Sequence, residues 1–309
     1  MHELGTRFAQ LRLRDLLLLE KIEELGSLRA VAEFFHLTQP AVTHALKALE
    51  HAFGALLVAR GRRGQRGVGL TIEGAAVLIR LRLAKTELLA AQVAAKLPNS
   101  FPLRIGSIPT GMLGILPRAL ADINQSHPSL RFTIMEAAVP QLWNGLARGE
   151  LDVILSRMPD MSDWDNLVPS MSYRTIRRER LELVAAANHP ASRKRKVDLA
   201  ELARRPWVLP PKGGYTRLAF DQLFIQQELD PPDPVVINGS YQANLLLAAT
   251  GQFLTVSPAS ALAVYQDFLK LKVFPAPWRD NSADIVVACR ENSKANPGVA
   301  QFMHAIANV

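Results

Sequence analysis

The 309-residue sequence contains one cysteine, Cys289. A single thiol cannot form an intrachain disulfide, and it cannot build a zinc site from cysteines. Cys289 lies in an apolar segment, where a buried and unreactive thiol is the usual state. Because scarce cysteine fits a reducing compartment, we expect the protein to be cytoplasmic.

Long hydrophobic runs are also missing. The run Leu16–Leu19 near the N-terminus is flanked by Asp15, Glu20 and Lys21, and it is far too short for the core of a signal peptide. No segment approaches the roughly 20 apolar residues of a transmembrane helix. We therefore expect no signal peptide and no membrane partner.

The motifs of several common enzyme classes are absent. The sequence has no GxSxG, no GxxxxGK[ST], and no His, Asp and Glu cluster with metal-ligand spacing. The histidines are scattered, and His127 and His189 each precede a proline, which suggests turns. We expect no enzyme here, and accordingly no catalytic residues, no metal and no cofactor.

Positive charge is concentrated in the N-terminal third of the chain. The formal net charge is +8 and the sequence pI about 9.9. Residues 1–97 hold 14 Lys and Arg against 9 Asp and Glu, a net of +5. A basic excess favours polyanions such as nucleic acid or an anionic membrane surface. A nucleic-acid contact should therefore be sought in residues 1–97.

Residues 37–50, which read LTQPAVTHALKALE, have the pattern of an amphipathic helix. Thr38 is a suitable N-cap, and Pro40 falls in the first turn, where its missing N–H does no harm. The apolar positions recur at three and four residues, typical of one helical face: Ala41, Val42, Ala45, Leu46 and Leu49. The other face is polar and carries Gln39, Thr43, His44 and Lys47. Taken alone, this face could be an ordinary solvated surface.

Two further helices are predicted before this one, over residues 13–25 and 28–35. Gly26 ends the first and Ser27 caps the second. The side chains expected to point inward from the second are Ala30, Val31 and Phe34. Two short helices joined by a tight turn, the latter with a polar outer face, are typical of a helix-turn-helix, although any small helical hairpin shares the pattern.

The segment RGRRGQRGVGLT, residues 60–71, predicts a β-hairpin wing. Its glycines allow a tight turn and close approach to another chain. Arg60, Arg62, Arg63 and Arg66 have no compensating acid and suit phosphates or a narrow minor groove. Val68 and Leu70 alternate like a strand that returns to the core. A flexible charged loop is the alternative, but a wing is favoured after a helix-turn-helix.

Residues 72–97 predict one long helix with a heptad seam. The seam consists of Ile72, Ala76, Ile79, Leu83, Thr86, Ala90, Val93 and Leu97. A narrow apolar stripe of this kind needs a partner helix, and a second copy of the chain would supply one. The alternative is that the stripe packs against other parts of the same chain.

Residues 101–309 alternate strand-like and helix-like segments. Strands are expected over 103–105, where Gly106 then opens a turn, and over 130–136 and 151–156. Helices are expected over 114–128 and 141–150, and the alternation predicts a parallel sheet flanked by helices. Further strands are expected over 180–190, 206–210, 234–238, 253–258 and 283–290, with a final helix over 297–309. The break near 172–180 and the resumption near 279–285 fit two lobes joined by two crossovers. Ligands of such folds bind at the C-terminal ends of strands.

These residues resemble the LysR-type transcriptional regulators, from about Leu11 to Val309. The most specific stretch is GSLRAVAEFFHLTQPAVTHALKALE (26–50), followed by RGVGLTIEG (66–74). Supporting segments are LPRALADINQSHP, RGELDVIL and LELVAAANHP. The resemblance implies an α/β protein with an N-terminal winged helix-turn-helix (1–71) and a linker helix that dimerises in antiparallel fashion (72–97). It also implies a two-lobed effector domain similar to periplasmic binding proteins (101–309), with lobe I at about 102–178 and 280–309 and lobe II at about 179–279.

The resemblance also implies DNA-binding residues. The base-reading positions fall on Gln39, Pro40, Thr43 and His44, just after the N-cap Thr38. Gln39 can pair with an adenine edge, and Pro40 offers apolar contact to a thymine methyl. The family often has Ser-Arg where this sequence has Thr43-His44, so an arginine fork to guanine is missing. Phosphate contacts are implied at Lys47 and Thr71, and one of Arg62, Arg63 or Arg66 is expected in the minor groove.

In the effector domain, the resemblance implies a small-molecule site at the strand ends. Its expected members are Ser107, Thr110, Val139, Arg157, Pro211 and Thr255. Thr110 corresponds to an anion-binding hydroxyl, and Arg157 could face a carboxylate or form a surface ion pair. The implied effector is a small organic acid, although Val139 replaces the threonine of some aromatic-acid responders. Implied partners are promoter DNA, a second copy of the chain as dimer or tetramer, and RNA polymerase. A ligand-binding module without DNA function is the competing class, and it would leave the wing arginines unexplained.

Overall fold

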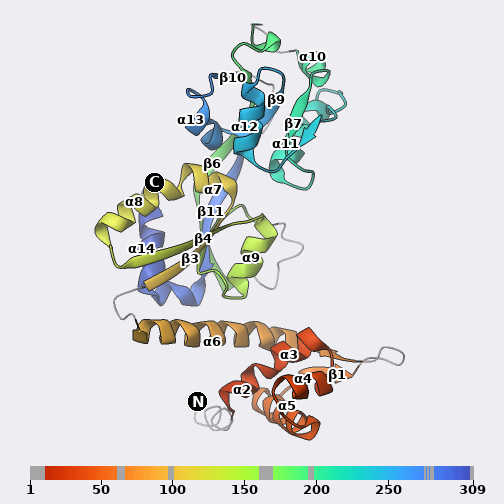
Figure 1. Ribbon diagram of the computed structural model, residues 1–309, viewed down its shortest axis with the longest axis vertical. Helices are drawn as coiled ribbons and strands as arrows, with labels where there is room; N and C mark the ends of the chain where they lie inside the picture. The colour runs from red at the N-terminus through yellow and green to blue at the C-terminus, as the bar shows by residue number, and fades with distance from the viewer. Residues whose placement is uncertain are drawn as a thin grey trace. The chain divides into compact units, whose positions relative to one another are not determined.

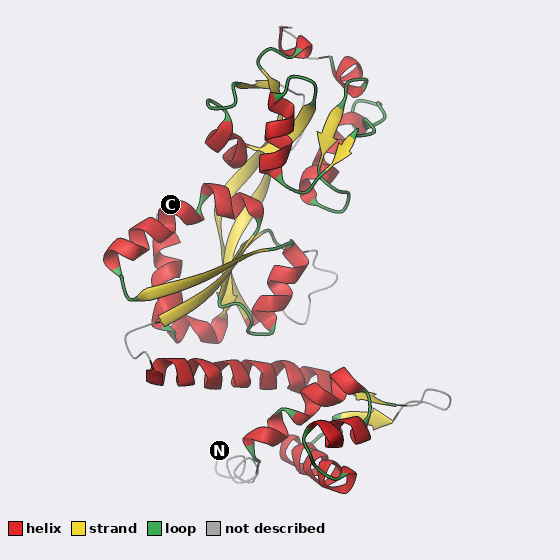
Figure 2. Cartoon of the chain, in the orientation of Figure 1, coloured by secondary structure: helices red, strands yellow, loops and turns green. Residues whose placement is uncertain are grey.

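The computed structural model describes residues 11–60, 67–96, 101–159, 170–193, 198–274, 276, 278 and 282–306. The chain divides into two compact units. The N-terminal unit ends at Pro98 and includes Ala147–Glu150, and the C-terminal unit consists of Asn99–Leu146 and Leu151–Val309. The first is mainly helical, and the second combines helices and strands (Figures 1 and 2). Among the described residues, no helix is long and apolar enough to cross a membrane.

In the described part of the N-terminal unit, the chain begins with four helices: α2 (Leu13–Leu16), α3 (Leu18–Leu25), α4 (Leu28–Phe34) and α5 (Gln39–Phe53). Gly26 and Gly54 end α3 and α5 with φ of 61° and 68°, a left-handed conformation that favours glycine. The Ser27 hydroxyl accepts from Ala30 N, and the Thr38 hydroxyl accepts from Ala41 N, so both predicted N-caps are confirmed. The fully buried side chains between these helices are Leu19, Ile22, Val31, Val42 and Leu49.

Two sequence-based expectations for these helices are wrong. The expected single helix over 13–25 is interrupted at Leu17, which ends α2 and precedes α3. Phe34 is not an inward residue, because its side chain is 52% exposed, whereas Ala32 is buried instead. The Phe34 ring lies edge-on to Phe35 and 4.5 Å beneath Lys21 Nζ. A cation over an aromatic face stabilises this partly wet position.

The predicted wing begins and ends in paired strands. β1 (Val58–Arg60) pairs antiparallel with β2 (Val68–Leu70), and Val58 lies opposite Leu70. Val68 and Leu70 are half-buried against the helical core, as expected for a strand that returns to it. The arginines Arg62, Arg63 and Arg66 lie outside the described residues.

The long helix α6 (Ile72–Lys96) has two apolar faces. Leu78 and Leu81 are buried in the core of the N-terminal unit. The predicted seam begins elsewhere on the helix, at Ile72, which is 88% exposed, and Ala76, which is exposed as well. The helix therefore packs on its own unit through residues outside the predicted seam, while Ile72 and Ala76 of the seam are exposed, and pairing of the seam with a second copy stays a prediction.

A nine-stranded mixed sheet runs through the C-terminal unit in the order β4-β3-β5-β11-β6-β9-β7-β8, with β10 paired to β6. Its strands are β3 (Phe101–Ser107), β4 (Leu130–Glu136), β5 (Val153–Ser156), β6 (Met171–Ala186), β7 (Trp207–Leu209), β8 (Val236–Ile237), β9 (Leu254–Pro258), β10 (Leu271–Phe274) and β11 (Ser282–Arg290). β3, β4 and β5 are parallel, as are β7, β8 and β9, but β6 and β11 are antiparallel to their neighbours. The parallel sheet predicted from residues 103–156 is confirmed for β3, β4 and β5, and the antiparallel strands β6 and β11 make the whole sheet mixed.

The helices of this unit are α7 (Pro109–Gly114), α8 (Leu116–Ser126), α9 (Val139–Ala147), α10 (Leu199–Ala203), α11 (Tyr215–Ile225), α12 (Tyr241–Ala249), α13 (Ala259–Tyr265) and α14 (Pro297–Ile306). Its two largest cores lie in two subdomains. The first subdomain surrounds a core that includes Leu103, Trp143 and Phe302, and the second surrounds Trp207, Phe220 and Phe224. The long strands β6 and β11 run from one subdomain into the other (Figure 1).

Candidate functional sites

The outward face of α5 forms a shallow groove. Its lining residues are Gln39, Pro40, Thr43, His44 and Lys47. They are the four residues that the sequence placed on the polar face together with Pro40, which the resemblance adds as a base-reading position, and the structure brings all five together. Thr43 is half-buried and the other four are exposed. None of the five is acidic, so the groove presents donors and a positive charge to an approaching polyanion.

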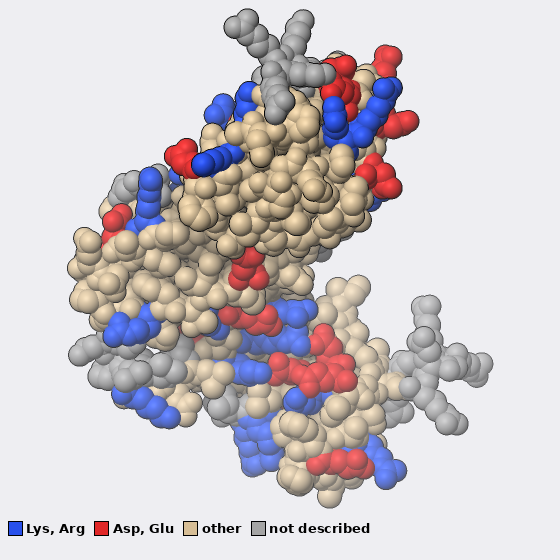
Figure 3. Space-filling model, turned by 45° about the horizontal axis from the view of Figure 1, so that its top comes forward, with Lys and Arg blue, Asp and Glu red and all other residues tan. Residues whose placement is uncertain are grey.

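Hydrogen bonds within the chain determine which groups Thr43 and Thr38 can present to a ligand. The Thr43 hydroxyl donates to Gln39 O at 3.0 Å, so it faces outward only as an acceptor with its methyl group. Thr38 accepts from Ala41 N at 3.4 Å and starts the helix. The donors left on the groove are Gln39, His44 and Lys47. In the view of Figure 3, basic and acidic side chains are mixed on the N-terminal unit, so net charge alone does not mark the DNA-binding face. The groove on α5, which has no acidic lining residue, is the better candidate for the nucleic-acid surface.

The wing is fixed to α5 by a carboxylate that sequence reasoning missed. Glu50 Oε1 accepts from Leu57 N at 3.0 Å and from Val58 N at 3.4 Å, directly where β1 begins. Thr71 completes this root, because its hydroxyl donates to Leu56 O at 2.7 Å and accepts from Gly74 N at 2.9 Å. Glu50 lies near the end of α5, and no sequence spacing indicates that its partners would be the backbone of β1.

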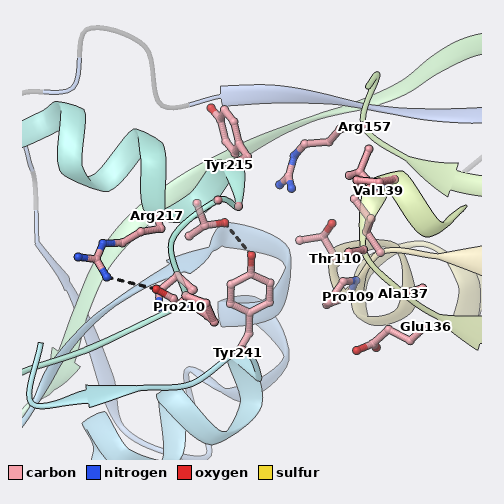
Figure 4. Close-up of a pocket in the computed structure, with 18 of the residues that line it drawn as sticks. Pro109, Thr110, Glu136, Ala137, Val139, Arg157, Pro210, Tyr215, Arg217 and Tyr241 are labelled. Atoms are coloured by element: carbon pink, nitrogen blue, oxygen red, sulfur yellow. Dashed lines mark hydrogen bonds between the residues drawn. The ribbon is translucent and has the colours of Figure 1, made fainter. Parts of the chain in front are cut away.

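A cleft of about 440 Å³ lies in the C-terminal unit (Figure 4). Four of the six residues expected at an effector site line it: Thr110, Val139, Arg157 and Pro211. Ser107 and Thr255 do not line it. Both are fully buried, and their hydroxyls donate to Ile108 O at 2.9 Å and to Val208 O at 2.8 Å. The cleft takes residues from both subdomains, after the ends of β3, β4, β5, β7 and β8.

Arg157 is the most unusual group in this cleft. Its Nε and Nη2 atoms are buried and have no hydrogen-bond partner in the part of the chain that the structure describes. Its guanidinium carbon lies 4.7 Å from the centre of the Tyr215 ring. Trp143 Nε1 donates to Arg157 O at 2.9 Å and fixes the backbone. Buried donors without acceptors are costly, so this edge of Arg157 is suited to an acceptor from outside the chain.

Hydroxyl groups surround the same space. Thr110 Oγ1, on a side chain only 1% exposed, also has no partner among the described residues. Thr216 Oγ1 and Tyr241 Oη are 2.6 Å apart, so one of the two hydroxyls donates a hydrogen bond to the other. Figure 4 shows Thr110, Tyr241 and Arg157 around the cavity, whereas Arg217 points away from it. Arg217 is engaged by Asp221 at 2.8 Å.

Several lining residues were not anticipated: Glu136, Lys212, Tyr215, Thr216 and Tyr241. Glu136 ends β4, while the others follow β7 and β8. Their positions after strand ends could have indicated them, because the C-terminal ends of parallel strands meet at one edge. The N-cap of α11 is Gly214, which has no side chain to accept a hydrogen bond from the first turn. The positive end of this helix dipole therefore faces the cleft without a capping side chain.

A winged helix-turn-helix with an open polar groove, joined to a second unit with a two-sided ligand cleft, defines a ligand-responsive DNA-binding protein. Comparison with protein families gives the same class. Residues 13–75 match the bacterial regulatory helix-turn-helix protein, lysR family, and residues 99–309 match the LysR substrate binding domain. The chain belongs to the LysR family. It is a DNA-binding transcriptional regulator with an effector-binding domain, and not an enzyme.

Curated relatives cover almost the whole chain. YdcI of Escherichia coli K12, an uncharacterized HTH-type transcriptional regulator, is 27% identical over 308 residues and covers 98% of each chain. The HTH-type transcriptional regulator GbpR of Azospirillum brasilense is 28% identical over 305 residues, which cover 96% of this chain and 86% of GbpR. Members of this family bind promoter DNA and small-molecule effectors, and they form oligomers.

Solved structures share the fold over 96% of this chain. The LysR family transcriptional regulator CbnR has a TM-score of 0.53 at 23% identity and is covered completely. CbnR complexed with its target DNA has a TM-score of 0.56 at 23% identity, with 99% of that chain covered. A full-length OxyR variant of Pseudomonas aeruginosa has a TM-score of 0.62 at 20% identity, with 95% covered. At these identities the likeness concerns the fold.

Proposed function

We propose that this cytoplasmic regulator reads an interrupted inverted repeat in promoter DNA as a dimer or tetramer. A small organic acid in the cleft of the C-terminal unit then changes DNA bending and the recruitment of RNA polymerase. The observation that carries the effector class is the buried, unpartnered Nε and Nη2 edge of Arg157 beside the unpartnered Thr110 hydroxyl, with partners counted over the described residues. Both groups are donors, and an acid supplies the acceptors that they lack.

The α5 groove supports the assignment of base contacts. Gln39 presents an amide that can pair with the N6 and N7 edge of adenine, and Pro40 can touch a thymine methyl. His44 donates or accepts at short reach, Thr43 accepts, and Lys47 contacts a phosphate. The hydroxyl proton of Thr71 is already donated to Leu56 O, so we assign Thr71 to the wing root. The wing arginines Arg62, Arg63 and Arg66 remain proposed phosphate or minor-groove contacts.

The seam of α6 supports pairing of two copies through this helix in antiparallel fashion. Ile72 and Ala76 are exposed, while the opposite side of the helix is used by Leu78 and Leu81 in the core. An exposed apolar stripe on a helix already anchored to its own unit favours association with a second stripe. Two DNA-binding units held in this way match a repeat with two half-sites.

The test of DNA reading is selective binding by the purified chain. Bound fragments are selected from genomic DNA, and Gln39→Ala is compared with Gln125→Ala, which changes an exposed glutamine of α8. Loss of one bidentate base contact should weaken binding by about 1–3 kcal/mol and relax preference at a single base pair. Equal weakening on all sequences would exclude base reading by Gln39, and binding indifferent to salt would contradict DNA recognition itself.

A further inference from the structure

Resting on the proposed effector role, we infer that the cleft binds a monocarboxylate that carries a hydroxyl group. The carboxylate meets Arg157 and Thr110, and the hydroxyl meets the Thr216–Tyr241 pair. The two recognition points lie on different walls of one cavity of about 440 Å³ (Figure 4), a volume in the range of small-molecule sites.

The geometry of Arg157 favours a carboxylate. Nε and Nη2 form one side-on edge of the guanidinium, and they are the two atoms left buried without acceptors in the described part of the chain. Two parallel N–H groups match the two oxygens of a carboxylate. The ring of Tyr215 lies 4.7 Å from the guanidinium carbon and holds its plane. The arginine is thus oriented before a ligand arrives, which lowers the entropy lost on binding.

The other charges of the cleft do not neutralise Arg157. Arg217 is paired with Asp221 and donates to Pro210 O at 3.4 Å, away from the cavity. Lys212 is exposed. Glu136 is the acidic residue among those that line the cleft, and it is exposed. Among the described lining residues, Arg157 is therefore the one cation with buried, unpartnered donors, and one such group matches one carboxylate on the ligand.

The Thr216–Tyr241 pair reads a hydroxyl. The two oxygens are 2.6 Å apart, so one donates to the other and a single proton remains for an outside acceptor. Both oxygens keep lone pairs that can accept a ligand proton. Thr216 is buried in the first turn of α11 and Tyr241 begins α12, so regular backbone holds both residues in place. Apolar walls from Ile108, Val139 and Pro140 suit the carbon chain between the two polar ends.

Titration calorimetry of the full chain tests this with matched ligands. Three hydroxylated monocarboxylates are compared with their deoxygenated partners: lactate with propanoate, gluconate with hexanoate, and quinate with cyclohexanecarboxylate. At least one hydroxy acid should bind about tenfold more tightly than its partner, as expected for one good hydrogen bond. Glucose, glucarate, glucose 6-phosphate and alanine test the need for one carboxylate and one hydroxyl.

Two variants separate the recognition points. Tyr241→Phe should weaken the hydroxy acid about tenfold and leave its partner unchanged, whereas Arg157→Lys should weaken both members of the pair. Tyr173→Phe, on an exposed tyrosine of β6, is the control. Equal affinity within every pair, no binding by any hydroxy acid, or tighter binding of glucarate, glucose 6-phosphate or alanine overturns the inference. Unchanged DNA binding without ligand shows that each variant is folded. If the chain binds DNA but none of the acids, the inference about the ligand is wrong while the proposed DNA-binding role stands.

Discussion

Gly74 allows α6 to touch the root of the wing, and Gly74→Ala should damage that contact. A Cβ at this position would lie 1.9 Å from Leu57 O and 2.8 Å from Leu57 C. The Leu57 peptide cannot easily move, because Leu57 O accepts from Thr71 N at 3.0 Å and Leu57 N donates to Glu50. The clash therefore falls on the backbone that starts β1.

The magnitude follows from opposing terms. Alanine in a helix gains at most about 1 kcal/mol over glycine. Overpacking costs about 1–3 kcal/mol, and a weakened backbone hydrogen bond costs about 1 kcal/mol more. The net loss of stability is therefore about 1–3 kcal/mol, and the displaced wing should also lower DNA affinity.

The assay uses the position of the tryptophans. All four, at 143, 164, 207 and 278, belong to the C-terminal unit. In urea, the helical circular dichroism of Gly74→Ala should begin to fall earlier, while the tryptophan fluorescence transition stays in place. Gly69→Ala is the control, because nothing lies within 4 Å of a Cβ there and no unusual φ is required. If both variants unfold alike, the close approach at Gly74 carries no energy and the reasoning fails.

Two other predictions concern the same unit. Leu78→Ala removes a side chain that is 1% exposed and should cost about 2–5 kcal/mol in urea unfolding followed by circular dichroism, whereas Leu88→Ala, 47% exposed, should cost far less. Burial alone would raise the pKa of Glu20, but hydrogen bonds and charges of Lys85 and Arg82 outweigh it and lower the pKa below the ordinary 4.5. Glu20→Gln should thus lose about 1 kcal/mol at pH 7, and the difference from the parent should vanish as the pH falls below 4.5 through the folded pKa; an equal difference at about pH 7 and about pH 3 would contradict the ion-pair explanation.

Features that depend on residues a few positions apart could be predicted from the sequence. Thr38 and Ser27 were identified as N-caps because capping depends on residues two or three positions apart. The groove on α5 followed from helical spacing for the same reason. Phe34 was misplaced because its contact with Lys21 comes from another helix, which no spacing within α4 reveals.

The lining of the cleft could be predicted only in part. The family resemblance indicated Thr110, Val139, Arg157 and Pro211, but Ser107, which ends β3, and Thr255, the second residue of β9, belong to the same set and turn into the protein. Alternation along a strand decides which side chains face the cleft, and a buried strand with apolar residues on both faces gives no signal of it. Tyr241 joined the site through β8, a strand of two residues that is too short for a periodic pattern.

The placement of α7 connects this cleft to the strands that join the subdomains. The helix begins beside the cleft with Thr110 and ends at Gly114, whose carbonyl accepts from Arg177 on β6 at 3.3 Å. On the same strand, Glu179 Oε1 accepts from Ser260 N at 2.9 Å in α13, which packs against α7. A ligand bound as proposed at Thr110 would therefore contact a short helix whose other end is hydrogen-bonded to the crossing strand β6.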